Sequence, residues 1–123
     1  MQIPADAELL RHIHPEQWLA EEQRPSSAAF KGQFRLSVNW KAIWGVEQTR
    51  RPNSAAVIKL IAEPCRKLGQ LVEHTPISAD EPFGPNPSHV DIVGEKPRPV
   101  ARQLANLATP EWIREAGSQR THP

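Results

Sequence analysis

His89 is the residue best placed for chemistry. It follows a turn bracketed by Pro85 and Pro87 and begins a short apolar stretch that stops at Gly94. A turn fixed by proline that opens into a strand can hold a side chain in one direction. An imidazole titrates near neutral pH, so His89 is our candidate catalytic acid or base. Alternation places Asp91 on the same face, and a simple surface pair of the two is the alternative interpretation.

A second group of residues suits an anion. Arg24, Ser26 and Ser27 lie within four positions of the chain and combine a guanidinium with two hydroxyls. Both kinds of group donate hydrogen bonds to phosphate or carboxylate oxygens. The competing interpretation is that Arg24 pairs with an acidic neighbour while the serines close a turn.

The charges are segregated along the chain although the net charge is only +1. Residues 24–67 hold nine basic and two acidic groups, whereas residues 1–23 hold one basic and five acidic groups. The basic middle adds Arg50 and Arg51 to the candidate anion-binding residues. The alternative is a solvated face whose cations meet the acidic segments once the chain has folded.

Cofactor and metal motifs are missing from the sequence. It contains no G-x-x-x-x-G-K, G-x-G-x-x-G or H-E-x-x-H pattern, and the pair His12 and His14 lacks further ligands for zinc. Cys65 is the only cysteine, so it cannot form an internal disulfide, and we expect a small buried residue rather than a nucleophile. We therefore predict neither a cofactor nor a metal.

Length and composition predict one domain. A chain of 123 residues that is 38% hydrophobic can build one core but not two. We expect a single globular domain over residues 1–117 and a flexible tail over 118–123. No long apolar run or basic, apolar start is present, so we expect a cytoplasmic protein that does not enter a membrane. The sequence leaves the oligomeric state open.

The elements that must position these residues follow from apolar spacing. Residues 6–13 and 15–19 suggest short helices that form an N-terminal flap. Alternation over 34–40 predicts a strand with one buried face. Residues 55–62 predict a second strand followed by a short helix, with one helix over 55–68 as the alternative.

The second half of the chain predicts two more strands and a closing helix. The strands span 70–75 and 89–93, and the helix spans 98–107, with 111–116 as its extension. Together these elements predict an α+β fold, in which a C-terminal helix covers a small mixed or antiparallel sheet of about four strands. We expect Phe34, Leu36, Val38, Trp40, Val57, Ile61, Val90, Ile92, Leu104 and Leu107 to share its core.

The order of motifs resembles that of a group of short, uncharacterised bacterial proteins. The resemblance is carried by Arg24-Pro25-Ser26-Ser27, by Leu36-Ser37-Val38 and by Asn86-Pro87-Ser88-His89 with Gly94. It spans most of residues 24–107 and implies a bacterial, self-contained domain without a transferable activity.

Two classes of function fit these observations, and whether the chain is an enzyme is left open. The first is an accessory or adaptor domain of a bacterial multi-protein system that binds a larger protein or nucleic acid. The second is a small enzyme acting on RNA or a nucleotide-like phosphate, with His89 as acid or base and Arg24, Ser26 and Ser27 holding the anion. The second class requires Arg24 and Ser26 to lie near His89.

Overall fold

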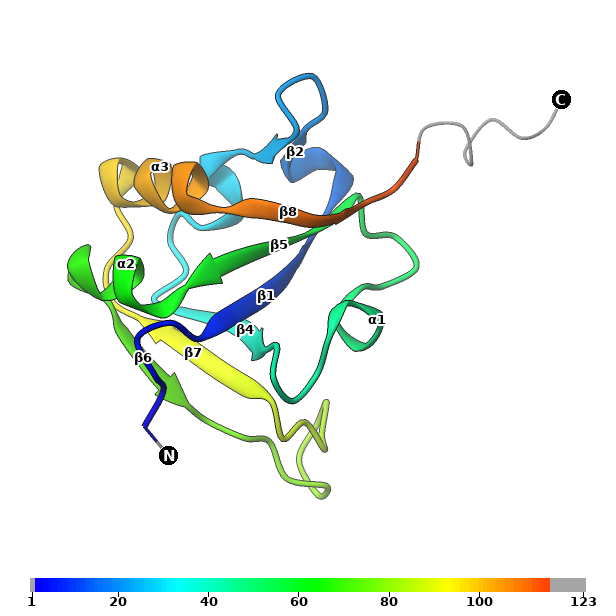
Figure 1. Cartoon of the computed structure of the whole chain (residues 1–123), viewed down its shortest axis with the longest axis vertical. Coiled ribbons are helices and arrows are strands. Elements are labelled where there is room, and N and C mark those ends of the chain that lie inside the picture. The colour runs from blue at the N-terminus through cyan, green and yellow to red at the C-terminus, as the bar shows by residue number, and fades with distance from the viewer. Residues whose placement is uncertain (1, 116–123) are drawn as a thin grey trace, which may run out of the picture.

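The computed structural model describes residues 2–115, and their dominant element is an antiparallel sheet. The six strands of this sheet run in the order β6-β7-β4-β1-β5-β8. They are β1 (Glu8–Ile13), β4 (Arg35–Trp40), β5 (Ala56–Ile61), β6 (Leu71–His74), β7 (His89–Val93) and β8 (Thr109–Ile113). In Figure 1 the sheet extends from β8 at the top to β6 at the bottom.

Shorter elements surround this sheet. A two-stranded sheet pairs β2 (Trp18–Leu19) with β3 (Arg24–Pro25). The 3-10 turns η1 (Pro15–Gln17) and η2 (Ser27–Ala29) flank it. The described α-helices are α1 (Val46–Thr49), α2 (Ala62–Lys67) and α3 (Arg98–Leu107). Within residues 2–115 no helix is both long and apolar enough to cross a membrane.

The predicted fold of about four strands with an N-terminal helical flap is wrong. The described chain is mostly sheet, with six strands in one sheet and two in another. The predicted helix over 6–13 is replaced by β1 from Glu8 to Ile13, because Leu9 and Leu10 are buried on opposite faces of a strand that lies between β4 and β5. A strand buried on both faces loses its alternation, and its apolar residues then mimic helical spacing.

The predicted extension of the last helix over 111–116 is also wrong. Ala108 has an extended backbone, and the chain then continues as β8 along β5. Pro110 is tolerated there because β8 is an edge strand of the sheet. The predicted tail over 118–123 lies outside the described residues.

The middle of the chain folds as its spacing predicts. The strand over 34–40 is confirmed by β4. β5 followed by α2 confirms the predicted strand and short helix, and the alternative of one helix over 55–68 is wrong. Strands β6 and β7 and helix α3 are confirmed at their predicted places. Leu36 is fully buried and Trp40 packs on the same core, so the buried face of β4 is assigned correctly.

Alternation gives the sheet one apolar and one polar face. The apolar face carries α3 and buries Leu9, Leu36, Val38, Ile58, Leu60, Val90, Ile92, Ala101 and Leu104 in one cluster. Phe34 and Leu107, which we predicted in this core, are 50% and 38% exposed. On the other face, Ser37 lies opposite Asp91 and Asn39 lies opposite His89 across β4 and β7.

A buried lysine fixes the chain between β7 and α3. Lys96 Nζ donates hydrogen bonds to the carbonyl oxygens of Phe34 (3.2 Å), Ile92 (2.7 Å) and Gly94 (3.1 Å). Gly94 has φ +151°, and a Cβ there would lie 2.8 Å from the Gln70 side chain. This turn therefore needs glycine, and it directs the chain into α3.

Candidate functional site

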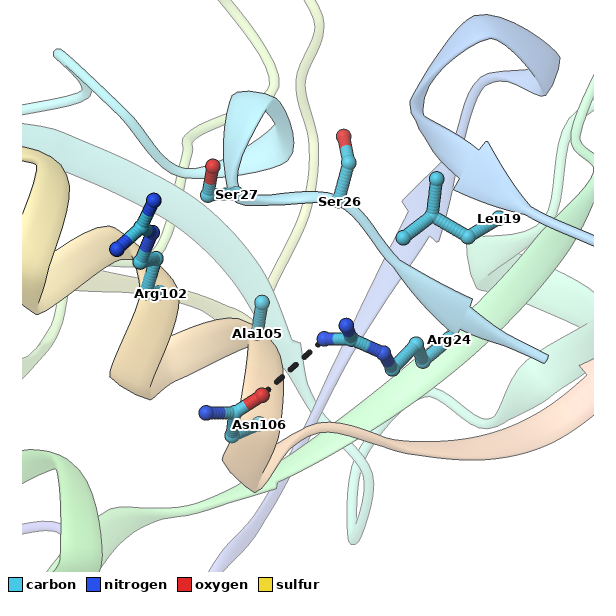
Figure 2. Close-up of a pocket in the computed structure, with 7 residues that line it drawn as sticks. All are labelled: Leu19, Arg24, Ser26, Ser27, Arg102, Ala105 and Asn106. Carbon is cyan, nitrogen blue, oxygen red and sulfur yellow. Dashed lines mark hydrogen bonds between the residues drawn. The ribbon is translucent and has the colours of Figure 1, made fainter. Parts of the chain in front are cut away.

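The structure brings Arg24, Ser26 and Ser27 together in one pocket. We call it the arginine–serine pocket; it is lined by Leu19, Arg24, Ser26, Ser27, Arg102, Ala105 and Asn106 and encloses about 320 Å³. Figure 2 shows that Arg102, Ala105 and Asn106 come from α3. Leu19 comes from β2, Arg24 from β3 and Ser27 from η2, and Ser26 lies between β3 and η2. The contact of α3 with η2 and β3 therefore builds the pocket.

Arg24 is held in place by two partners. Its Nη2 lies 2.8 Å from Glu22 Oε1, and its Nη1 donates to Asn106 Oδ1 at 3.1 Å. The alternative interpretation of an arginine paired with an acidic neighbour is thus confirmed for Arg24. The bond to Asn106, drawn as a dashed line in Figure 2, also turns the guanidinium toward α3.

Three further donors of this pocket have no partner among the described residues. Arg102 and the hydroxyls of Ser26 and Ser27 make no hydrogen bond or ion pair with any residue between 2 and 115. These donors line one hollow whose floor includes the buried Ala105. Oxygens of a carboxylate or a phosphate would satisfy several of them at once.

His89 lies elsewhere, in a larger concavity on the polar face of the sheet. We call it the histidine cleft. Its volume is about 480 Å³, and none of its lining residues also lines the arginine–serine pocket. The floor comes from β1, β4 and β7, and the walls come from the residues around α1 and from the loop between β6 and β7; together they include Leu10, Arg11, His12, Ser37, Asn39, Trp44, Arg51, Ile77, Phe83 and His89.

The hydrogen bonds of His89 tie three segments together. Its Nδ1 lies 2.9 Å from the carbonyl oxygen of Thr75, so Nδ1 carries the proton and donates it. Nε2 then accepts from Ser37 Oγ at 3.1 Å. Asp91 Oδ1 lies 3.8 Å from Nε2, as the same-face pairing predicts, and Asp91 is also 3.5 Å from Arg35.

His12 and Arg11 bring buried basic groups to the cleft. Burial, and to a lesser degree the positive charges of Arg51, His14 and Arg11, lower the pKa of His12 to about 4. Burial also lowers the pKa of Arg11. The Nε of Arg11 is buried without a hydrogen-bond partner, whereas its Nη1 donates to the carbonyl oxygen of Ser37 at 2.8 Å. Arg11 was not among our candidates, and His12 was considered only as a zinc ligand, because their place in the cleft depends on contacts between strands distant in sequence.

The neighbouring residues Arg50 and Arg51 lie on different surfaces. Arg51 lines the histidine cleft. Arg50 points to another surface, where it lies 3.1 Å from Glu47 and 4.9 Å above the ring of Trp112. Only one of the pair therefore faces a concavity that could hold an anion.

The basic middle is largely neutralised in the fold. Five of its nine cations have a carboxylate within 4 Å, namely Arg24, Arg35, Lys41, Arg50 and Lys59. Lys41, for example, lies 3.2 Å from Glu8 and 2.7 Å from Glu111. The alternative in which the cations meet acidic segments is thus confirmed for Arg24, Arg35, Lys41 and Lys59, whereas Arg50 pairs with Glu47 inside the basic middle.

Cys65 and the histidines hold neither a reactive thiol nor a metal site in the described part of the chain. Cys65 is buried, and burial raises the pKa of its thiol to about 11. Residues 2–115 contain no group of three or more histidine, cysteine or acidic side chains placed to hold a metal ion.

Comparison of the chain with protein-family models, with curated proteins and with solved structures gave no match in any of the three. The arginine–serine pocket and the histidine cleft are therefore the two candidate functional sites. Arg24 and Ser26 line one of them and His89 the other, so the active site that would combine all three is not assembled.

Proposed function

We propose that the chain is a small adaptor domain that binds an anionic group of a larger protein partner in the arginine–serine pocket. The observation that carries the proposal is the unpaired guanidinium of Arg102, which shares a pocket with two unpaired hydroxyls among residues 2–115. Following the resemblance described above, we propose a bacterial multi-protein system as its setting.

The distribution of the basic side chains over the surface favours a ligand with a single anionic group over a polyanion. A nucleic acid is held by many phosphate contacts along a basic stripe. In this fold most cations of residues 24–67 are paired with carboxylates, whereas the pocket gathers donors around one small hollow. A phosphorylated or carboxylate-bearing side chain of a protein fits such a hollow.

The partner supplies the acceptors that the pocket lacks. A phosphoserine offers three oxygens, so it can bond to a guanidinium and to hydroxyls together. Arg24 is already oriented by Glu22 and Asn106, so little side-chain freedom is lost when the anion binds.

Calorimetric titration with a short phosphoserine peptide tests this proposal. The same peptide without the phosphate, and with glutamate in place of phosphoserine, serves for comparison. Arg102→Gln should weaken phosphopeptide binding by about tenfold or more, since it removes a charged hydrogen-bond donor. Arg98→Gln is the matched control, because Arg98 lies on the same helix and does not line the pocket. Equal affinity for all three peptides would contradict the proposal.

A titration with nucleic acid tests the alternative that the partner is a nucleic acid and not a protein. Single-stranded DNA should bind weakly, and Arg50→Glu with Arg51→Glu should change phosphopeptide affinity little. Tight DNA binding that falls steeply with salt and is lost in this double variant would replace the protein partner by a nucleic acid.

A further inference from the structure

The histidine cleft contains a cation without a counter-ion. Arg11 forms no ion pair with any described residue, and its Nε is buried without a hydrogen-bond partner. The guanidinium is only partly buried, since its Nη1 donates to the Ser37 carbonyl oxygen in an exposed hydrogen bond. A partly desolvated charge without a counter-ion is nevertheless unfavourable. An anion in the cleft would remove this imbalance.

The other ionisable side chains that line the cleft are positively charged or neutral. Arg51, His12 and His89 line it together with Arg11, and no aspartate or glutamate is among the lining residues. Asp91 lies beside His89 but is shared with Arg35. Arg51 itself makes no side-chain hydrogen bond or ion pair within residues 2–115. The cleft is therefore electropositive where a ligand would enter.

Apolar side chains border these cations. Trp44, Ile77 and Phe83 line the same cleft. Phe83 is 96% exposed, so its ring is open to a ligand. Flat rings stack on aromatic side chains, and the stacking does not depend on which ring is offered.

We propose that the histidine cleft binds a small phosphomonoester that carries a planar ring, of the size of a nucleoside monophosphate. The phosphate accepts hydrogen bonds from Arg11 and Arg51, and the ring lies against the aromatic wall. A volume of about 480 Å³ accommodates such a ligand. This site is separate from the arginine–serine pocket and does not depend on the function proposed for it.

The neighbouring arginines offer a matched test. The four common nucleoside monophosphates, inorganic phosphate and adenosine are titrated by calorimetry against the whole chain. We expect at least one monophosphate to bind more tightly than either phosphate or adenosine. Arg51→Gln should weaken that binding by about tenfold or more, whereas Arg50→Gln should leave it unchanged, because Arg50 lies outside the cleft.

Three results would overturn the inference. Saturation by none of the four monophosphates would remove the site. If inorganic phosphate binds as tightly as the monophosphates, the ring does not contribute to binding. If Arg51→Gln and Arg50→Gln lose the same affinity, the binding is not specific to the cleft. Arg102→Gln should leave monophosphate binding intact, so failure here and failure of the adaptor proposal can be told apart.

Discussion

Replacing His89 by alanine should destabilise the fold. The imidazole is mostly buried, with 14% of the side chain exposed. The change removes the bond from Nδ1 to the Thr75 carbonyl oxygen (2.9 Å) and the bond from Ser37 Oγ to Nε2 (3.1 Å). Each such bond contributes roughly 1 kcal/mol, and the lost packing adds to this. We expect the free energy of unfolding to fall by about 2 kcal/mol, mainly because Ser37 of β4 and Thr75 lose their hydrogen bonds to the imidazole.

Thermal unfolding followed by circular dichroism measures the effect. For a domain of this size, about 2 kcal/mol corresponds to a decrease in Tm of roughly 8 °C. His74→Ala is the control: His74 Nε2 donates to the Pro87 carbonyl oxygen at 2.8 Å, but that bond is solvent-exposed, so its loss should matter less. A His89→Ala variant that melts like the unmodified protein, yet no longer binds nucleoside monophosphate, would refute the structural role and make His89 a ligand contact.

Two further predictions concern buried basic groups. Lys96→Met should lower the free energy of unfolding by about 3 kcal/mol or more, because three carbonyl oxygens lose their donor; a loss below about 1 kcal/mol in urea denaturation would contradict the assigned bonds. His12 is neutral in the fold down to pH of about 4 because burial lowers its pKa from 6.5, so the unfolded chain takes up the proton first. Stability should therefore decrease by about 1–2 kcal/mol between pH 6.5 and 4, and His12→Asn should lose less over the same range.

The middle of the fold could be predicted because its signals are local. In β4 one face is buried and the other polar, so the residues from Arg35 to Trp40 alternate as the burial does. Pro64 in the first turn of α2 and Gly69 just after its end mark this helix in the same local way. β1 could not be recognised, because the adjacent Leu9 and Leu10 are both fully buried although they point to opposite faces of the strand. Its burial is a property of the assembled sheet and not of the segment.

The candidate sites could likewise be predicted only where their residues are close together in the sequence. Arg24, Ser26 and Ser27 are close in sequence, so their grouping could be predicted. Their pocket, however, is completed by α3, and Arg24 and Asn106 lie 82 residues apart along the chain. The cleft depends even more on tertiary contacts, since Arg11, Arg51 and His89 come from three separate segments. Only folding shows that Arg51 faces a concavity and that Arg50 does not.

Alternation along β4 explains how one small sheet can carry two separate recognition surfaces. Leu36 and Val38 point to the core beneath α3, the helix that completes the arginine–serine pocket. Ser37 and Asn39 point to the opposite face and line the histidine cleft. The donors of the two concavities share no side-chain contact, so binding in one does not use groups needed by the other. The two proposed ligands, an anionic group of a protein and a small phosphorylated molecule, would therefore bind independently, with the apolar core between them.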